Sequence, residues 1–176
     1  GKAALAEARR AQSLPEQEGR YFGSKELQRV TVFALSKHDN LKEALSELNK
    51  MLPKISRQPD AMEQLPDVLY QRAMIYDRMG DQGKAIADLR RVVELAPDNA
   101  NGLNALGYIL LSPTKKNLDE AFKLIQAAYQ IEPENPAIND SLGWAYFLKD
   151  DVQTALPYLQ YAFEKYPDAE VAAHLG

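Results

Sequence analysis

Two histidines, His38 and His174, are the residues in this chain best suited to acid–base chemistry, and there is no cysteine. The absence of cysteine excludes both a thiol nucleophile and a thiolate metal site. The two histidines lie far apart in the sequence, and neither has a recognisable partner motif around it. His38 stands beside Asp39, and we interpret it as a residue at the C-terminal end of a helix.

Pairs of carboxylates are the second group that could perform acid–base chemistry. They occur at 119–120 and 150–151, where we expect helices to begin. Acidic side chains are favoured there because the N-terminal end of a helix carries a partial positive charge. The sequence has no glycine-rich phosphate loop, no HExxH motif and no nucleophile elbow. We therefore expect a protein without catalytic residues, cofactor or bound metal.

Composition limits the partners that such a protein can have. The chain has 21 Lys and Arg against 25 Asp and Glu, a net charge of −4, with no long run of one sign. Nucleic-acid binding needs clustered basic side chains, so this balance argues against it. No apolar run is long enough to span a membrane. What remains is a protein partner or a peptide partner.

The organisation of the chain is set by a repeated pattern. The segment Asn104–Tyr108 has the same form as Asp140–Trp144, and Gly107 and Gly143 are 36 residues apart. Small residues follow at fixed offsets, and each repeat closes on a proline. A period of this size with these small residues is typical of a solenoid of helical hairpins.

The pattern of Leu-Gly, an aromatic residue, then Ala, a large apolar residue, Ala and Pro resembles the tetratricopeptide repeat (TPR). The resemblance implies an all-α fold, a right-handed superhelical solenoid of antiparallel helix pairs. The expected divisions are degenerate TPR-like helices over 1–65, a repeat over 66–99, a repeat with a two-residue insertion over 100–135, a repeat over 136–169, and the start of a truncated repeat over 170–176.

Several helix boundaries can be predicted from capping and breaking residues. We expect helices over 25–37, 41–52, 66–79 and 83–95, with a partial helix beginning near Asp60. Asn40 and Asn117, each followed three residues later by Glu, form capping-box patterns. Gly80 should end a helix, and Asn135 before a proline should cap the next one.

In a TPR frame the first helix of each hairpin lines the inner groove. The small residues, such as Gly107 and Gly143, are expected to let the two helices of a hairpin approach closely. Trp144 has two open readings, an aromatic anchor in the groove or a core residue, whereas Tyr146 is interpreted as core. The residues expected to line the groove and bind a partner are Tyr70, Met74, Asp77, Arg78, Asn101, Asn104, Tyr108, Leu111, Asp140, Trp144, Phe147 and Leu148.

One known TPR function is not supported by these positions. TPR domains that bind the C-terminal carboxylate of cytosolic chaperones use Lys, Asn and Arg at set positions of their first helices. The corresponding residues here are Asn104, Tyr108, Asp140 and Trp144. This substitution argues against a receptor for chaperone tails.

Beyond the general repeat, the segments at 104–108, 140–144, 155–159 and 170–176 resemble the C-terminal part of long TPR lipoproteins of Gram-negative bacteria. The resemblance implies a periplasmic scaffold, lipid-anchored to the outer membrane in the full-length protein. Such an adaptor would bring a carboxy-terminal processing protease to substrates such as cell-wall hydrolases. The alternatives are an accessory subunit of a secretion, pilus or envelope complex, and a cytoplasmic module tethered to an enzyme.

Overall fold

The computed structural model describes residues 40–111 and 116–175, and all regular elements within those ranges are α-helices. The all-α prediction is therefore confirmed. The predicted helix over 25–37 lies outside the described residues. The helices are α3 (Leu41–Ile55), α4 (Ala61–Arg78), α5 (Gln82–Leu95), α6 (Ala100–Leu110), α7 (Leu118–Ile131), α8 (Pro136–Leu148), α9 (Val152–Lys165) and α10 (Ala169–Leu175). The chain divides into two compact units, unit 1 (Gly1–Ala85) and unit 2 (Ile86–Gly176).

In unit 1, α3 packs against α4. The apolar residues of α3 recur every three or four positions, which places them on one face of the helix. The buried core between the two helices consists of Ala44, Leu48, Met51, Ile55, Val68 and Ile75. Because neither helix could cover this apolar stripe alone, their pairing is stabilised by the burial of both stripes.

Both helices of unit 1 run through a proline that was expected to bound them. Helix α3 continues past Pro53 to Ile55, and α4 joins the partial helix expected near Asp60 to the one expected over 66–79, with Pro66 inside it. The predicted boundaries at 52 and 66 are therefore wrong. A proline removes one backbone hydrogen bond from a helix. Here burial of Ile55 at one site, and of Pro66 itself at the other, favours continuing the helix.

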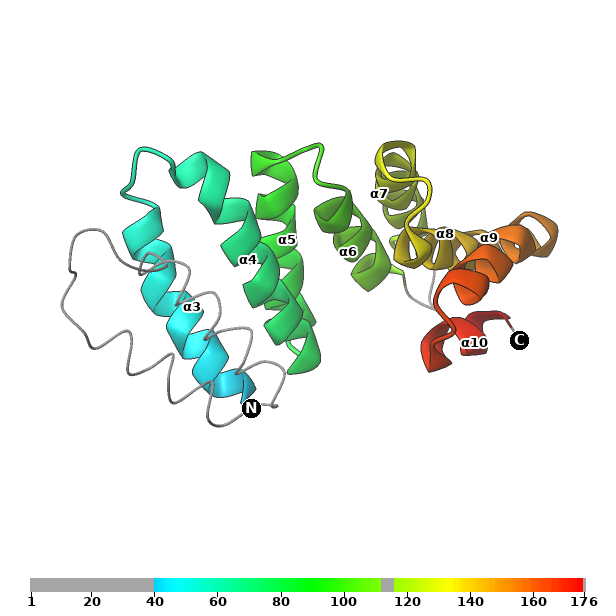
Figure 1. Cartoon of the computed structure of the whole chain (residues 1–176), viewed down its shortest axis with the longest axis horizontal. Coiled ribbons are helices and arrows are strands. Elements are labelled where there is room, and N and C mark those ends of the chain that lie inside the picture. The colour runs from blue at the N-terminus through cyan, green and yellow to red at the C-terminus, as the bar shows by residue number, and fades with distance from the viewer. Residues whose placement is uncertain (1–39, 112–115, 176) are drawn as a thin grey trace. The chain divides into compact units, whose positions relative to one another are not determined.

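Unit 2 contains α5 from Ile86 onward, the hairpins α6/α7 and α8/α9, and α10 (Figure 1). Helix α7 also packs on α8, and α10 packs on α9. The first helices of successive hairpins touch one another, since α6 contacts α8 and α8 contacts α10. This third set of contacts places side chains from three separate repeats on one surface.

Glycines permit the close approach of the two helices in each hairpin of unit 2. A Cβ atom on Gly107 would lie 2.6 Å from Ile125 Cγ1 and 3.0 Å from the Ala121 carbonyl oxygen. A Cβ atom on Gly143 would lie 2.6 Å from Leu159 Cγ. These distances are shorter than van der Waals contact, so the expectation of close approach at both glycines is confirmed.

The predicted helix caps were right at one site and wrong at two. Asn135 Oδ1 accepts a hydrogen bond from the Ala137 N–H at 3.0 Å, as expected for a cap before Pro136. Asn40 and Asn117 precede α3 and α7, but their side chains make no capping bond. Their ψ angles of 55° and 18° lie outside the extended conformation that lets a capping side chain reach the third residue of the helix.

Left-handed backbone conformations close two of the turns between consecutive helices. Gly80, between α4 and α5, has φ +78°, which agrees with its predicted role in ending a helix. Asp150, between α8 and α9, has φ +65° and occupies the equivalent turn. In both turns the following N–H donates to a carbonyl in the last turn of the helix, Asp81 to Tyr76 at 2.8 Å and Asp151 to Tyr146 at 3.0 Å.

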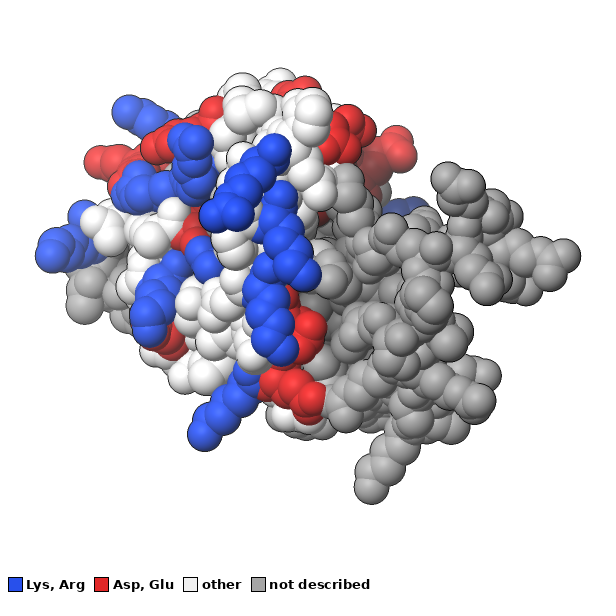
Figure 2. Space-filling model, turned by 90° about the vertical axis from the view of Figure 1, so that its left-hand side faces the viewer, with Lys and Arg blue, Asp and Glu red and all other residues white. Residues whose placement is uncertain are grey.

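Basic side chains are prominent on unit 1. Figure 2 looks onto the side of the molecule where α3 lies, and Lys and Arg side chains stand out over its described surface. Helix α3 contributes the exposed Lys42, Lys50 and Lys54.

Among the described residues, no helix combines the length and the apolar character needed to cross a lipid bilayer.

Candidate functional site

Three helices of unit 2, α6, α8 and α10, bring aromatic and acidic side chains onto one surface. We call this surface the aromatic face and define it by Tyr108, Asp140, Trp144, Phe147, Glu170 and His174. Residues three or four positions apart on a helix share one side of it, which places Asp140, Trp144 and Phe147 together along α8. Helices α6 and α10 lie against α8 and add the other three residues.

The rings of the aromatic face are stacked. The Trp144 and Phe147 ring centroids are 5.0 Å apart with 16° between the planes. The Trp144 and His174 centroids are 4.4 Å apart with 17° between the planes. Tyr108 lies farther out, with its centroid 6.4 Å from that of His174. Trp144 is only half-buried, and Phe147 is 43 % exposed, so the stack remains accessible to a partner.

Asp140 and His174 form a buried pair beneath this stack. His174 Nδ1 lies 3.0 Å from each carboxylate oxygen of Asp140. The side chains of His174 and Asp140 are 11 % and 9 % exposed. The sequence offered no partner motif for His174, and the structure supplies a partner. This partner comes from the preceding repeat, 34 residues away in sequence, and therefore has no local motif.

One further polar contact lies on the aromatic face, and an unsatisfied amide oxygen lies beside it. The Tyr108 hydroxyl donates a hydrogen bond to Glu170 Oε1, which connects α6 to α10. Asn104 lies one turn before Tyr108 on α6, and its Oδ1 atom is buried without a hydrogen-bond donor among the described residues. A buried acceptor without a donor costs about 1–3 kcal/mol, so this position is retained at some expense of stability.

The residues predicted to line the groove are distributed over both units. Asn101 is exposed, Leu111 is half-buried at the end of α6, and Leu148 is only 8 % exposed, which leaves little of it for a partner. On α4, in unit 1, Arg78 is exposed and the other three predicted residues, Tyr70, Met74 and Asp77, are half-buried. Burial raises the pKa of the Tyr70 phenol above its usual value.

Tyr146 packs between helices, as the sequence indicated. Its ring meets that of Phe122 on α7 edge-on, with centroids 5.0 Å apart. It also stacks on Tyr158 of α9 at 5.7 Å. Tyr158 in turn contacts Tyr129 of α7 edge-on, so these rings fill the space between successive hairpins.

The hydroxyl group nearest to Asp140 in sequence has a hydrogen-bond partner other than His174. The nearest hydroxyl in sequence, Ser141, donates to the Ala137 carbonyl oxygen at 3.0 Å, within its own helix. In the part of the chain that the structure describes, no three His, Asp or Glu side chains converge as a metal site would require. With the imidazole stacked on Trp144, the pair connects α10 to α8.

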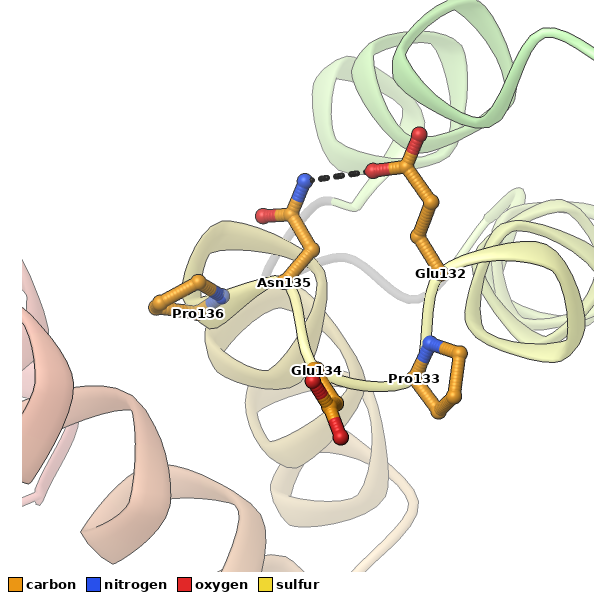
Figure 3. Close-up of a pocket in the computed structure, with 5 residues that line it drawn as sticks. All are labelled: Glu132, Pro133, Glu134, Asn135 and Pro136. Carbon is orange, nitrogen blue, oxygen red and sulfur yellow. Dashed lines mark hydrogen bonds between the residues drawn. The ribbon is translucent and has the colours of Figure 1, made fainter.

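A hollow at the turn between α7 and α8 is lined by Glu132, Pro133, Glu134, Asn135 and Pro136 (Figure 3). Several of its polar groups already have local partners. Asn135 Nδ2 donates to Glu132 Oε2 at 2.8 Å, as Figure 3 shows, and the Glu134 carbonyl accepts from the Tyr161 hydroxyl at 3.2 Å. These contacts fix the turn and the start of α8, so the hollow is a feature of the repeat junction.

Sequence reasoning missed Glu170 and His174 as part of the candidate site. A signal for them was present, because Leu175-Gly176 repeats the Leu-Gly of the first helices at 106–107 and 142–143. That third Leu-Gly marks 169–175 as another first helix, and first helices share a face. The frame could therefore have placed both residues beside Tyr108 and Trp144.

Comparison with known proteins identifies the repeat. A family model described as Tetratricopeptide repeat matches residues 23–173. A TPR repeat-containing protein of Pseudomonas aeruginosa is 42 % identical over 120 residues, which are 66 % of this chain and 20 % of that protein. The chain thus spans about a fifth of the length of this curated relative.

Solved structures show the same fold. One is the crystal structure of YrrB, described as a TPR protein with an unusual peptide-binding site. It superposes with a TM-score of 0.64 at 21 % identity, and the match covers 98 % of this chain and 81 % of the YrrB chain. A thermophilic TPR protein of Thermus thermophilus has a TM-score of 0.66 at 18 % identity, covering 82 % and 75 %. At these identities the likeness concerns the fold alone.

Proposed function

Because the chain belongs to the tetratricopeptide-repeat family, we propose that it is a non-catalytic scaffold that holds a protein partner against the aromatic face of unit 2. Proteins of this family generally mediate protein–protein interactions, through surfaces formed by successive repeats. Partner binding is the expected role of a surface to which each repeat adds its own side chains.

The observation that carries this proposal is the accessible aromatic stack. Phe147 is 43 % exposed and Trp144 is half-buried on α8. Aromatic residues are enriched among the few side chains that dominate protein interfaces. The Trp144 ring is held by the His174 ring that stacks on it, and His174 is itself fixed by its hydrogen bond to Asp140. Because the rings are already ordered, little conformational entropy is lost when a partner binds.

The finer proposal is an envelope adaptor that binds a protease, its substrates, or both. It is supported by the resemblance of the repeats to Gram-negative TPR lipoproteins and by the 42 % identity to a protein of Pseudomonas aeruginosa. In this proposal the full-length protein is periplasmic and anchored to the outer membrane by a lipid. A carboxy-terminal processing protease and cell-wall hydrolases are the proposed partners.

An affinity experiment tests the proposal. The chain is immobilised and used to capture proteins from detergent-solubilised envelopes of the organism that encodes it, alongside Phe147→Ala and the double variant Tyr108→Ala/Trp144→Ala. Phe163→Ala is the matched control, because Phe163 is 36 % exposed on α9 and lies outside the aromatic face. Far-UV circular dichroism establishes that each variant keeps its helical content.

We expect a serine protease and wall hydrolases to be captured by the wild type and the control, and to be lost from the aromatic-face variants. Capture of a secretion, pilus or other envelope assembly would instead favour the accessory-subunit alternative. If the variants capture the same proteins as the wild type, binding takes place elsewhere and the aromatic face is not the site.

A further inference from the structure

The aromatic face carries hydrogen-bond acceptors and aromatic rings but no lysine or arginine of its own. Helices α6, α8 and α10 contain no Lys or Arg at any position. They contribute the carboxylates of Asp140 and Glu170. This distinguishes them from α7 and α9, which carry Lys123 and Lys165 and pack behind them.

The single histidine on this face does not reverse its charge. His174 is committed to Asp140, with Nδ1 3.0 Å from each carboxylate oxygen, so a protonated ring at most neutralises that pair. Lys149, at the end of α8, bonds Asp119 of α7 at 2.9 Å and lies 5.1 Å from the Phe122 ring. Neither group supplies a free cation beside Glu170.

The exposed carboxylate of Glu170 can accept a hydrogen bond from a partner. Glu170 is exposed, and a carboxylate has acceptor sites beyond the one used by the Tyr108 hydroxyl. Asn104 is half-buried as a residue while its Oδ1 atom has no donor among the described residues.

We infer that the aromatic face binds a partner segment in which arginine or lysine, arginine above all, adjoins an apolar residue. This inference rests on the proposed function and specifies the chemistry of the partner. A guanidinium group offers five N–H donors, pairs with carboxylates and lies flat on aromatic rings. The apolar neighbour would lie against the exposed ring of Phe147, and the cation near Glu170 and Tyr108.

A peptide selection tests the inference directly. Short random peptides displayed on phage are selected on the immobilised chain and counter-selected on Phe147→Ala. Each selected peptide is then synthesised with arginine and with citrulline, which has the same shape without the charge. Binding is followed by the fluorescence of Trp144, the one tryptophan in the chain, which reports from the site itself.

We expect the selected peptides to be rich in arginine or lysine beside apolar residues. The arginine form of each peptide should bind with at least about fivefold higher affinity than the citrulline form. Glu170→Gln should weaken the arginine peptide by roughly two- to fivefold and leave the citrulline peptide unchanged. Glu164→Gln, which alters an exposed carboxylate on α9, is the matched control and should change neither.

The possible failures are distinguishable. Acidic or uncharged peptides that bind and perturb Trp144 would overturn this inference and leave the proposed function standing. Basic peptides that bind Glu170→Gln as tightly as the wild type would also overturn it. If no peptide distinguishes the wild type from Phe147→Ala, both the inference and the aromatic face as a docking site are contradicted.

Discussion

The imidazole of His174 lies almost parallel to the indole of Trp144, with centroids 4.4 Å apart and 17° between the planes. Trp144 belongs to α8 and His174 to α10, so the stack joins two successive repeats. The same imidazole bonds the buried carboxylate of Asp140, one turn before Trp144. One side chain therefore both covers the tryptophan and provides a hydrogen-bond partner for a buried carboxyl group.

These two roles of His174 can be separated by substitution. His174→Ala should move the fluorescence emission of Trp144 to longer wavelength, because the indole loses the ring that covers it, and should destabilise unit 2 by about 1–3 kcal/mol, because Asp140 loses its hydrogen-bond partner. His174→Phe keeps a ring in place, so the emission should stay near that of the wild type while stability still falls. Emission that is unchanged in His174→Ala would show that α10 does not cover Trp144.

Close approach of the helices in each hairpin predicts a cost for any side chain at Gly107 or Gly143. Gly107→Ala would force Ile125 Cγ1 and the Ala121 carbonyl away from the new Cβ, which should cost about 1–3 kcal/mol of unfolding free energy. Gly143→Ala should behave alike against Leu159. Urea unfolding followed by circular dichroism measures both. Equal stability of either variant and the wild type would contradict the packing described here.

Two neighbouring glycines should respond to alanine with opposite signs. Gly80 has φ +78° and open space where a Cβ would lie, so Gly80→Ala should lose about 1–2 kcal/mol through backbone strain alone. Gly83 lies inside α5, and a Cβ atom added to it would make an ordinary contact of 3.9 Å with Asp81 Oδ1. Gly83→Ala should therefore gain up to about 1 kcal/mol. Thermal unfolding of the pair provides the comparison, and a loss in both variants would argue against the backbone explanation.

Alkaline pH should destabilise unit 1 through Tyr70. Burial raises the pKa of its phenol above the ordinary value of 10.0, so the unfolded chain releases this proton first. The stabilising contribution is complete below pH 10.0 and is lost as the pH rises toward the folded-state pKa. Tyr70→Phe should therefore shift alkaline unfolding to higher pH, measured by circular dichroism during a base titration.

Tyr166 provides the control for that titration because its side chain is 63 % exposed. Tyr166→Phe should leave the midpoint of alkaline unfolding unchanged. A shift of the same size in both variants would mean that the loss of any tyrosine, and not the burial of Tyr70, determines the midpoint.

Helix ends show where reasoning from local sequence failed. The capping patterns at Asn40 and Asn117 have the right residue types, but the backbone there does not adopt the extended conformation that a side-chain cap requires. Local rules place helix boundaries at Pro53 and Pro66, whereas tertiary burial of Ile55 and Pro66 keeps the helices continuous. A local signal is worth about 1 kcal/mol at a cap, and burial of a large apolar side chain contributes more.

The sequence by itself determined the hairpin repeat, because Gly107, Gly143 and the alanines recur at intervals that only a stack of close-packed helices requires. It also placed Tyr108, Trp144 and Phe147 on first helices. Only the tertiary structure brought Glu170 to Tyr108 and His174 to Asp140. Those pairs join residues 62 and 34 positions apart, and such contacts depend on how whole repeats stack, which short-range spacing does not specify.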